Sequence, residues 1–306
     1  MAGQTLVTAW NADPVTLALL VVLLGGYLLA LGPLRARILP GGVVPRGRVA
    51  AYVGGVALLA LTLLSPLDAL GRDYLLTARM TQLMILVTLV APLLMIGLPE
   101  ALAVRLLPVQ KWREATGSLL FIVIAVVGFN ALVLVWQVPR FYELSIRDNL
   151  WHEIANLSYL AAGVLTWWPL LTPTDRQARL SSPLQMVYLA LESLPIDIFG
   201  VAIIFAPAPL YATYLHAPRI TALSAMADQQ VAGALLALPG NILDIFFMSI
   251  IFFVWIERME RAQRRHERVA IERELADTTN AMPGESATHA SEDPVSSAQA
   301  NSDTMP

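Results

Sequence analysis

The side chains best suited to chemistry stand at the starts of three long apolar segments. In chain order they are Arg79 and Gln82, then His152, Glu153 and Asn156, and then Asp228, Gln229 and Gln230. Imidazole, carboxylate and amide groups can bind a metal ion or hold a proton, and they are costly to bury in lipid unless they have a partner or a purpose. If the three segments begin on the same side of a bilayer, these residues form one polar cluster.

Part of this cluster also has a purely structural explanation. A carboxylate at a helix start is favoured by the free N–H groups of the first turn and by the helix dipole, which would account for Glu153 and Asp228. His152, beside Trp151, could equally be an interfacial histidine. Arg79 differs, because a cation at a helix start is unfavourable. We therefore predict that Arg79 forms an ion pair with a carboxylate, and Asp228 is the first candidate.

Further carboxylates lie deeper in the apolar segments. Glu192 and Asp197 flank Pro195, whose missing N–H leaves a carbonyl free. Asp244 follows Asn241 by about one helical turn. These groups could form a path for protons or cations, or they could join helices through hydrogen bonds worth about 1 kcal/mol each.

Two thioethers, Met80 and Met84, stand one turn apart in the segment that begins near Arg79. Thioether and imidazole donors suit copper, so Met80, Met84 and His152 are candidate copper ligands. Methionine at this spacing also fills space in apolar helices without any ligand role. The chain has no cysteine, which excludes thiolate metal sites, disulfides and cysteine nucleophiles.

The segments that carry these groups are predicted to cross a membrane. Hydrophobic residues make up 57% of the chain and charged residues only 14%, less than a soluble domain carries. A span needs roughly 20 mostly apolar residues, and continuous apolar runs in lipid must be helical. We therefore predict an all-α integral membrane protein, a bundle of about seven transmembrane helices. The expected spans are Val15–Leu31, Val49–Leu64, Met80–Leu98, Gly117–Val138, Leu150–Leu171, Leu184–Phe205 and Gln230–Ile256.

Basic residues predict the orientation, because they collect in cytoplasmic loops. With the N-terminus outside and the C-terminus cytoplasmic, fifteen Lys and Arg residues lie inside and five lie outside. The polar cluster then faces the extracytoplasmic side of a multi-pass protein in a bacterial plasma membrane. The first span has no basic leader and no small-residue cleavage site, so we expect it to be retained rather than removed as a signal peptide.

The chain is predicted to divide into three parts. Residues 1–256 form the seven-helix membrane domain, 257–276 a charged cytoplasmic helix, and 277–306 a disordered tail. The charged helix has Glu and Arg spaced four residues apart, which favours ion pairs along one face. The tail is rich in small and polar residues and has almost no large apolar ones. No internal repeat is visible, which weighs against an inverted-repeat transporter.

A set of short motifs follows the predicted spans in order. The motifs are Leu64-Ser65-Pro66-Leu67-Asp68, Met80-Thr81-Gln82, Ala91-Pro92-Leu93-Leu94, Gly97-Leu98-Pro99, Trp167-Trp168-Pro169, Leu210-Tyr211 with Tyr214, and Asp228-Gln229-Gln230 with Gly233. Their order and spacing, from Trp10 to about Trp255, resemble the cytochrome c oxidase assembly factor CtaG family.

The resemblance implies a role in maturing haem–copper terminal oxidases through copper supply, with oxidase subunits as partners. Typical members of that family carry a His-x-x-x-His pair at the start of the third span and another at the start of the fifth. Here Arg79 and Leu83 stand at the first pair of positions, and His152 and Asn156 at the second. The resemblance thus implies a divergent member that assists oxidase assembly, either by delivering copper or as a metal-free chaperone.

Two other classes of function were weighed. A small proton- or cation-coupled transporter would use Glu192, Asp197 and Asp244. An enzyme such as a haem-modifying synthase would need paired core histidines, and only His152 lies near a span end. We therefore expect no enzymatic activity, lipid and oxidase subunits as partners, and no nucleic-acid binding.

Overall fold

The computed structural model describes residues 10–38, 44–99, 102, 119–171 and 180–281, and the regular elements in these ranges are all helical. Within this part of the chain, seven helices are long and apolar enough to cross a membrane. The predicted fold class, an all-α bundle of seven candidate transmembrane helices, is confirmed.

The spans alternate with short connecting helices. The spans are α2 (Pro14–Leu31), α4 (Arg46–Leu64), α6 (Leu76–Ile85) continued by η1 (Leu86–Val90) and α7 (Ala91–Gly97), α10 (Leu119–Leu134) continued by η2 (Val135–Gln137), α12 (Asn149–Leu171), α13 (Ser182–Ile204) and α15 (Ala225–Ala281). The connecting helices are α3 (Arg35–Ile38), α5 (Pro66–Asp73), α11 (Pro139–Arg147) and α14 (Ala212–His216).

Three spans begin a few residues before their predicted starts, at Arg46, Leu76 and Ala225. The prediction began each span after its first charged or polar residues, whereas the structure places those residues inside the first turns of the helices. For α6 the reason is plain: Arg79 is only 1% exposed, so it belongs to the packed interior and not to a connecting loop.

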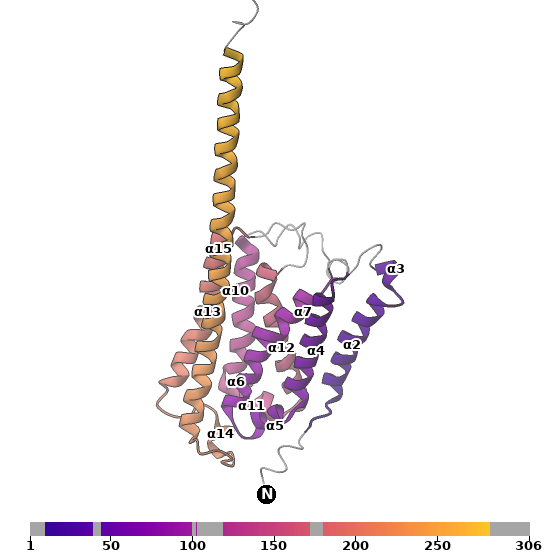
Figure 1. Cartoon of the computed structure of the whole chain (residues 1–306). Helices are drawn as coiled ribbons and strands as arrows, with labels where there is room; N and C mark the ends of the chain where they lie inside the picture. The colour runs from indigo at the N-terminus through magenta and orange to yellow at the C-terminus, as the bar shows by residue number, and fades with distance from the viewer. Residues whose placement is uncertain (1–9, 39–43, 100–101, 103–118, 172–179, 282–306) are drawn as a thin grey trace, which may run out of the picture. The chain divides into compact units, whose positions relative to one another are not determined.

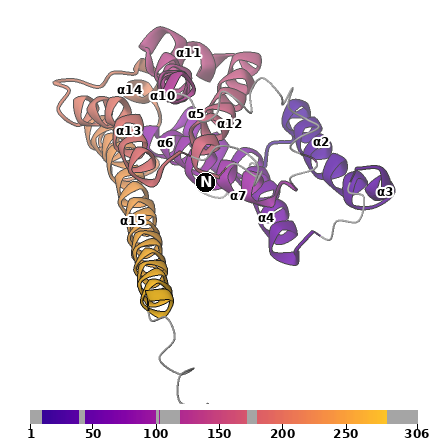
Figure 2. The same ribbon diagram turned by 90° about the horizontal axis from the view of Figure 1, so that it is seen from above.

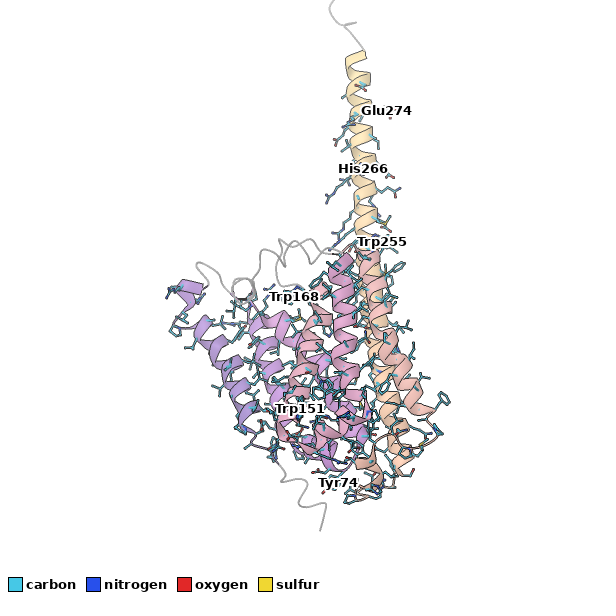
Figure 3. The ribbon with its side chains drawn as sticks, turned by 180° about the vertical axis from the view of Figure 1, so that it is seen from behind. Tyr74, Trp151, Trp168, Trp255, His266 and Glu274 are labelled. Atoms are coloured by element: carbon cyan, nitrogen blue, oxygen red, sulfur yellow. The ribbon has the colours of Figure 1, made fainter. Side chains whose placement is uncertain are left out.

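The short helices α5, α11 and α14 gather at the end of the bundle where α6 and α12 begin (Figure 1). We call this end the polar end. The sequence analysis placed no helix in these connections. Each of these helices is brief, and α5 begins with a Ser65 cap whose Oγ accepts a hydrogen bond from Leu67 N at 3.3 Å. Figure 3 shows Trp151 and Trp168 toward opposite ends of α12, as expected of aromatic residues at the two borders of a membrane.

Helix α2 lies at the edge of the bundle beside α4 (Figure 2). The rings of Tyr27 and Tyr52 stack between them with centroids 3.9 Å apart. The Tyr27 hydroxyl donates to the Gly97 carbonyl of α7 at 3.0 Å. Only glycine fits at this point, because a Cβ on Gly97 would stand 2.5 Å from the Tyr52 backbone nitrogen.

The third span contains a π-helical turn, η1, between two α-helical parts. Pro92 follows this turn and has no N–H, so the carbonyl groups one turn before it lose a donor. The indole N–H of Trp167 in α12 replaces that donor and binds the Val87 carbonyl at 2.9 Å. Gly163 allows the close approach of α12, since its Cβ would lie 2.7 Å from Ala91 Cβ.

Helices α13 and α15 meet through two glycines. A Cβ on Gly200 would stand 2.8 Å from the Gly233 carbonyl oxygen, and a Cβ on Gly233 would stand 2.6 Å from the Gly200 carbonyl oxygen. The two backbones are therefore in direct contact, which is how small residues let helices pack closely in membranes.

The chain divides into two compact units between Phe252 and Phe253. The described part of the second unit is the remainder of α15, in which Arg261 pairs with Glu257, and Arg264 Nη2 lies 3.7 Å from Glu260 Oε2. Residues 277–281 belong to this helix and not to the predicted tail.

Several predictions fall on parts of the chain that the structure does not describe. The remaining tail, residues 282–306, is one of these parts. Five of the basic residues used to predict the orientation also lie outside the described residues: Arg105, Lys111, Arg113, Arg176 and Arg179. Apart from residues 277–281, which are helical, the three-part division stays a prediction, and so does the orientation of the termini.

Candidate functional site

Asp68 joins three helices at the polar end. It lies on α5, is 2% exposed, and its Oδ1 accepts hydrogen bonds from Gln82 Nε2 of α6 at 3.0 Å and from His152 Nε2 of α12 at 2.9 Å. Burial alone would raise the pKa of the Asp68 carboxyl, but the hydrogen bonds from His152 and Gln82 and the nearby charge of Arg79 outweigh it and lower the pKa below its usual value. Asp68 is therefore a carboxylate at neutral pH.

Arg79 extends from α6 to α12. Its Nη1 donates to Gln82 Oε1 at 3.3 Å and to Asn156 Oδ1 at 2.8 Å. Its guanidinium carbon lies 5.5 Å from the centre of the Tyr159 ring, which is within the range of a cation–π interaction. The other two nitrogens, Nε and Nη2, are buried and have no hydrogen-bond partner in the structure. We call Asp68, Arg79, Gln82, His152 and Asn156 the polar-end cluster.

His152 is fully buried, and both of its ring nitrogens face acceptors. Nδ1 lies 3.1 Å from the Ser145 carbonyl oxygen, and Nε2 lies 2.9 Å from Asp68 Oδ1. A carbonyl oxygen can only accept, so Nδ1 carries a hydrogen, and the short contact between Nε2 and Oδ1 needs a second proton on that axis. Both ring nitrogens are thus engaged by oxygen atoms, and neither offers a free lone pair.

The predicted ion pair between Arg79 and Asp228 does not form. Asp228 caps another helix instead: its Oδ2 accepts from Leu76 N at 2.8 Å and its Oδ1 accepts from Thr77 N at 3.1 Å. The first turn of α6 has free N–H groups and no capping side chain of its own, so α15 supplies the acceptor. These backbone N–H groups, and not Arg79, donate hydrogen bonds to the Asp228 carboxylate.

The remaining residues predicted for the cluster hold neighbouring elements and lie outside the polar-end cluster. Glu153 Oε2 accepts from the Thr16 hydroxyl at 3.0 Å, which ties α12 to α2. Gln229 Oε1 accepts from Leu210 N at 2.6 Å, and its Nε2 donates to the Ile203 carbonyl at 3.3 Å, so it secures the connection between α13 and α14. Gln230 is exposed, and its Nε2 lies 3.5 Å from the Ile204 carbonyl oxygen.

Three tyrosines pack beside the cluster and were not predicted as part of it. Tyr214 donates to the Gly71 carbonyl, and its oxygen therefore accepts from the Tyr142 hydroxyl at 2.8 Å. Tyr211 stacks on Tyr142 with ring centroids 3.8 Å apart and donates to the Gln137 carbonyl at 2.9 Å. Burial raises the pKa of all three phenols, so they stay protonated and act as donors.

A cavity of about 640 Å³ lies at the polar end, and Asp68 is one of its lining residues. Arg72 also lines it and is held by hydrogen bonds from its Nη2 to the Ile146 carbonyl at 3.2 Å and to Asn149 Oδ1 at 2.8 Å. The cavity lining includes both acidic and basic side chains, Asp73 and Arg147 among them. It therefore has no single charge that would select a simple cation or a simple anion.

The deeper carboxylates gather at a second place. Glu192, Asp197 and Asp244 line a cavity of about 40 Å³ together with Thr166 and Met84. Thr166 donates its hydroxyl hydrogen to Glu192, and Asp197 Oδ1 is buried without a hydrogen-bond partner in the structure. A cavity of this volume has room for water, because one water needs only about 10–15 Å³ on this measure. We call it the mid-bundle cavity.

The sequence analysis missed Asp68 as a site residue, although it stood inside one of the motifs. Its signal was the Ser65-Pro66 start of a short helix just before the third span. It also missed Gly71, whose Cβ would stand 2.8 Å from Gln82 Oε1 and 3.2 Å from Arg79 Cα. Only a glycine lets α5 lie this close to α6, and that contact brings Asp68 onto Gln82.

The fold and the site together define a multi-pass helical membrane protein whose buried polar groups join the helices at one end. Residues 25–258 match the family model described as cytochrome c oxidase caa3 assembly factor. This match covers most of the chain and the whole polar-end cluster. The chain belongs to that family, as the resemblance implied.

Two curated relatives are similar to this chain. They are "Uncharacterized protein Mb0105" of Mycobacterium bovis and "Uncharacterized protein MT0111" of Mycobacterium tuberculosis. Each is 26% identical over 280 residues, which is 86% of this chain and 42% of the relative. The chain thus spans less than half the length of these relatives. No solved structure matches it.

The donor set at the polar end does not fit copper. His152 has both ring nitrogens engaged, Met80 lies fully buried in the apolar core, and Met84 lines the mid-bundle cavity. Among the described residues, no three His, Cys, Asp or Glu side chains lie together in a way that could hold a metal ion. The guanidinium of Arg79, with two nitrogens unpartnered, also places a positive charge within the cluster.

We predict that Asp68→Asn lowers the free energy of unfolding by about 1.5–3 kcal/mol at neutral pH, because it removes the charge from two buried hydrogen bonds. The folded pKa of Asp68 lies below its unfolded value, so the carboxylate stabilises the native state fully above about pH 4 and less as pH falls through the folded pKa. Thermal unfolding in detergent should therefore show the two proteins converging below about pH 4.

Asp73→Asn is the matched control for this measurement, since Asp73 is an exposed carboxylate on the same short helix. It should unfold like the wild type at every pH. If Asp68→Asn has the same thermal stability as the wild type at neutral pH, the Asp68 hydrogen bonds do not stabilise the folded state.

Proposed function

We propose that this protein assists the assembly of a haem–copper terminal oxidase in the plasma membrane of a bacterium. The observation that carries the proposal is the family match over residues 25–258. The proposed partners are subunits of that oxidase, which the protein contacts within the lipid bilayer. The proposed role is that of a chaperone and not an enzyme.

The proposed orientation puts the polar end on the extracytoplasmic side. Its support is the excess of basic residues in the loops and the tail at the other side, because such residues are retained in the cytoplasm. A reporter fused after Ile256 should then be active only as a cytoplasmic fusion. Activity of an extracytoplasmic reporter at this position would reverse the topology.

The polar-end cluster supports a role in holding shape rather than in chemistry. Its residues bond to one another and to backbone groups, which leaves no pair of a nucleophile and a free base. A rigid end on the bundle gives a client subunit a surface of constant form. The polar-end cavity that includes Asp68 and Arg72 is a recess that such a client could enter.

Deletion of the gene should lower the amount and activity of the haem–copper oxidase in isolated membranes, measured by its haem absorbance and by oxygen uptake. Wild-type protein supplied in trans should restore both. Arg79→Gln should restore less than wild type, because it removes the charge that holds Gln82 and Asn156. Normal oxidase spectra in the deletion strain would refute the proposed function.

Arg140→Gln is the control for these strains, because Arg140 is an exposed arginine in α11 at the same end of the bundle. It should restore the oxidase as wild type does. Immunoblots of the membranes must show equal amounts of each variant, so that a loss of folding is not taken for a loss of function.

The mid-bundle cavity favours a second candidate, a small proton- or cation-coupled transporter. Glu192 and Asp244 are only 8% and 9% exposed, and ionisable groups inside a membrane bundle commonly mark an ion path. The two carboxylates come from facing helices, α13 and α15, and share a cavity with room for water.

If the protein is a transporter, vesicles that contain it should carry a proton flux, measured with an internal pH dye, and Asp244→Asn should abolish it. Asp277→Asn, an exposed carboxylate in the same helix, should leave the flux unchanged. Equal flux in vesicles with Asp244→Asn and with wild type would exclude this candidate.

A further inference from the structure

The guanidinium of Arg79 is a buried cation that forms no ion pair with a carboxylate of the described residues. It is 1% exposed, and among the described residues its hydrogen bonds go from Nη1 to two neutral amide oxygens, those of Gln82 and Asn156. Two carboxylates at the same end of the bundle are hydrogen-bonded to other groups, Asp68 to Gln82 and His152, and Asp228 to the backbone of α6. The hydrogen-bond acceptors of this positive charge are therefore neutral dipoles, and an aromatic face lies beside it.

This environment stabilises a positive charge. Two amide oxygens, from Gln82 and Asn156, accept hydrogen bonds from the guanidinium. Its central carbon lies 5.5 Å from the centre of the Tyr159 ring. His152 lies one helical turn before Asn156 on α12. A guanidinium suits such a place because its charge is spread over a plane and is only weakly hydrated.

We infer that Arg79 is a built-in cation that takes the place of a metal ion in the polar-end cluster, so that this protein does its work without copper. The charge that would otherwise come from a bound ion is covalently part of α6. A second cation beside it would be repelled, and the imidazole that could bind one already has its two ring nitrogens at hydrogen-bond distance from Ser145 and Asp68.

Asn156 belongs to the same arrangement. Its Oδ1 lies 2.8 Å from Arg79 Nη1, so the amide acts as an acceptor for a fixed cation. A histidine at this position could coordinate a metal together with His152, because side chains four residues apart share one helix face. With Arg79 present, that histidine would face a guanidinium and not an open coordination site.

The test measures Cu(I) binding by purified protein in competition with a colorimetric Cu(I) chelator. Wild type should take no more copper than His152→Ala. Asn156→His should also take none, because Arg79 still supplies the charge. The double variant Arg79→His with Asn156→His removes the cation, presents imidazole at both places beside His152, and should bind about one copper per chain.

Two results would overturn the inference. One is copper bound by wild type and lost in His152→Ala. The other is copper bound by Asn156→His as tightly as by the double variant, since Arg79 would then exclude nothing. The wild-type measurement decides the question even if the double variant fails to fold.

Thermal unfolding tests the structural half of the inference. Arg79→Gln should lower the melting temperature more than Arg79→Lys, because lysine keeps a cation next to Gln82 and Asn156. An unchanged melting temperature in Arg79→Gln would show that the cluster needs no cation. The inference rests on the proposed role in oxidase assembly and deepens it. Because these measurements use the purified protein alone, a failure of the inference about Arg79 can be distinguished from a failure of the proposed function.

Discussion

The hydrogen bonds from Gln82 and His152 to the Asp68 carboxylate connect α5, α6 and α12. Inside a membrane bundle there is no bulk water to satisfy a polar group, so each one has to find its partner in the protein. Asp68 meets this constraint for two buried side chains at once. Asp228 does the same for the first turn of α6, and these two carboxylates together fix where the third span begins.

Long apolar runs made the spans predictable, because lipid permits little besides a helix there. The errors fell at the helix starts. The prediction placed Arg79 at the border of a span because charged side chains usually contact water. The structure instead buries Arg79 against Tyr159. The ion pair with Asp228 was wrong for a related reason: sequence cannot reveal that the backbone N–H groups of another helix compete for the same carboxylate.

The site was partly predictable. The shared starts of three spans pointed to Arg79, Gln82, His152 and Asn156, and the structure brings these four together. Glu153, Asp228 and Gln229 proved to hold neighbouring elements. Asp68 and Tyr214 come from connections that the apolar pattern treats as loops, and their contribution depends on the close packing of α5, which only the backbone at Gly71 allows.

The π turn of the third span has a geometric effect on everything that follows it. An extra residue in a helix rotates the downstream face by about 100°, since each residue advances the α-helix by that angle. In an unbroken α-helix the Gly97 end would turn away from Tyr27 and Tyr52, while Arg79 and Gln82 kept their places. The third span thus consists of two helical parts that face different directions. The part before the π turn faces polar partners, and the part after it faces apolar ones.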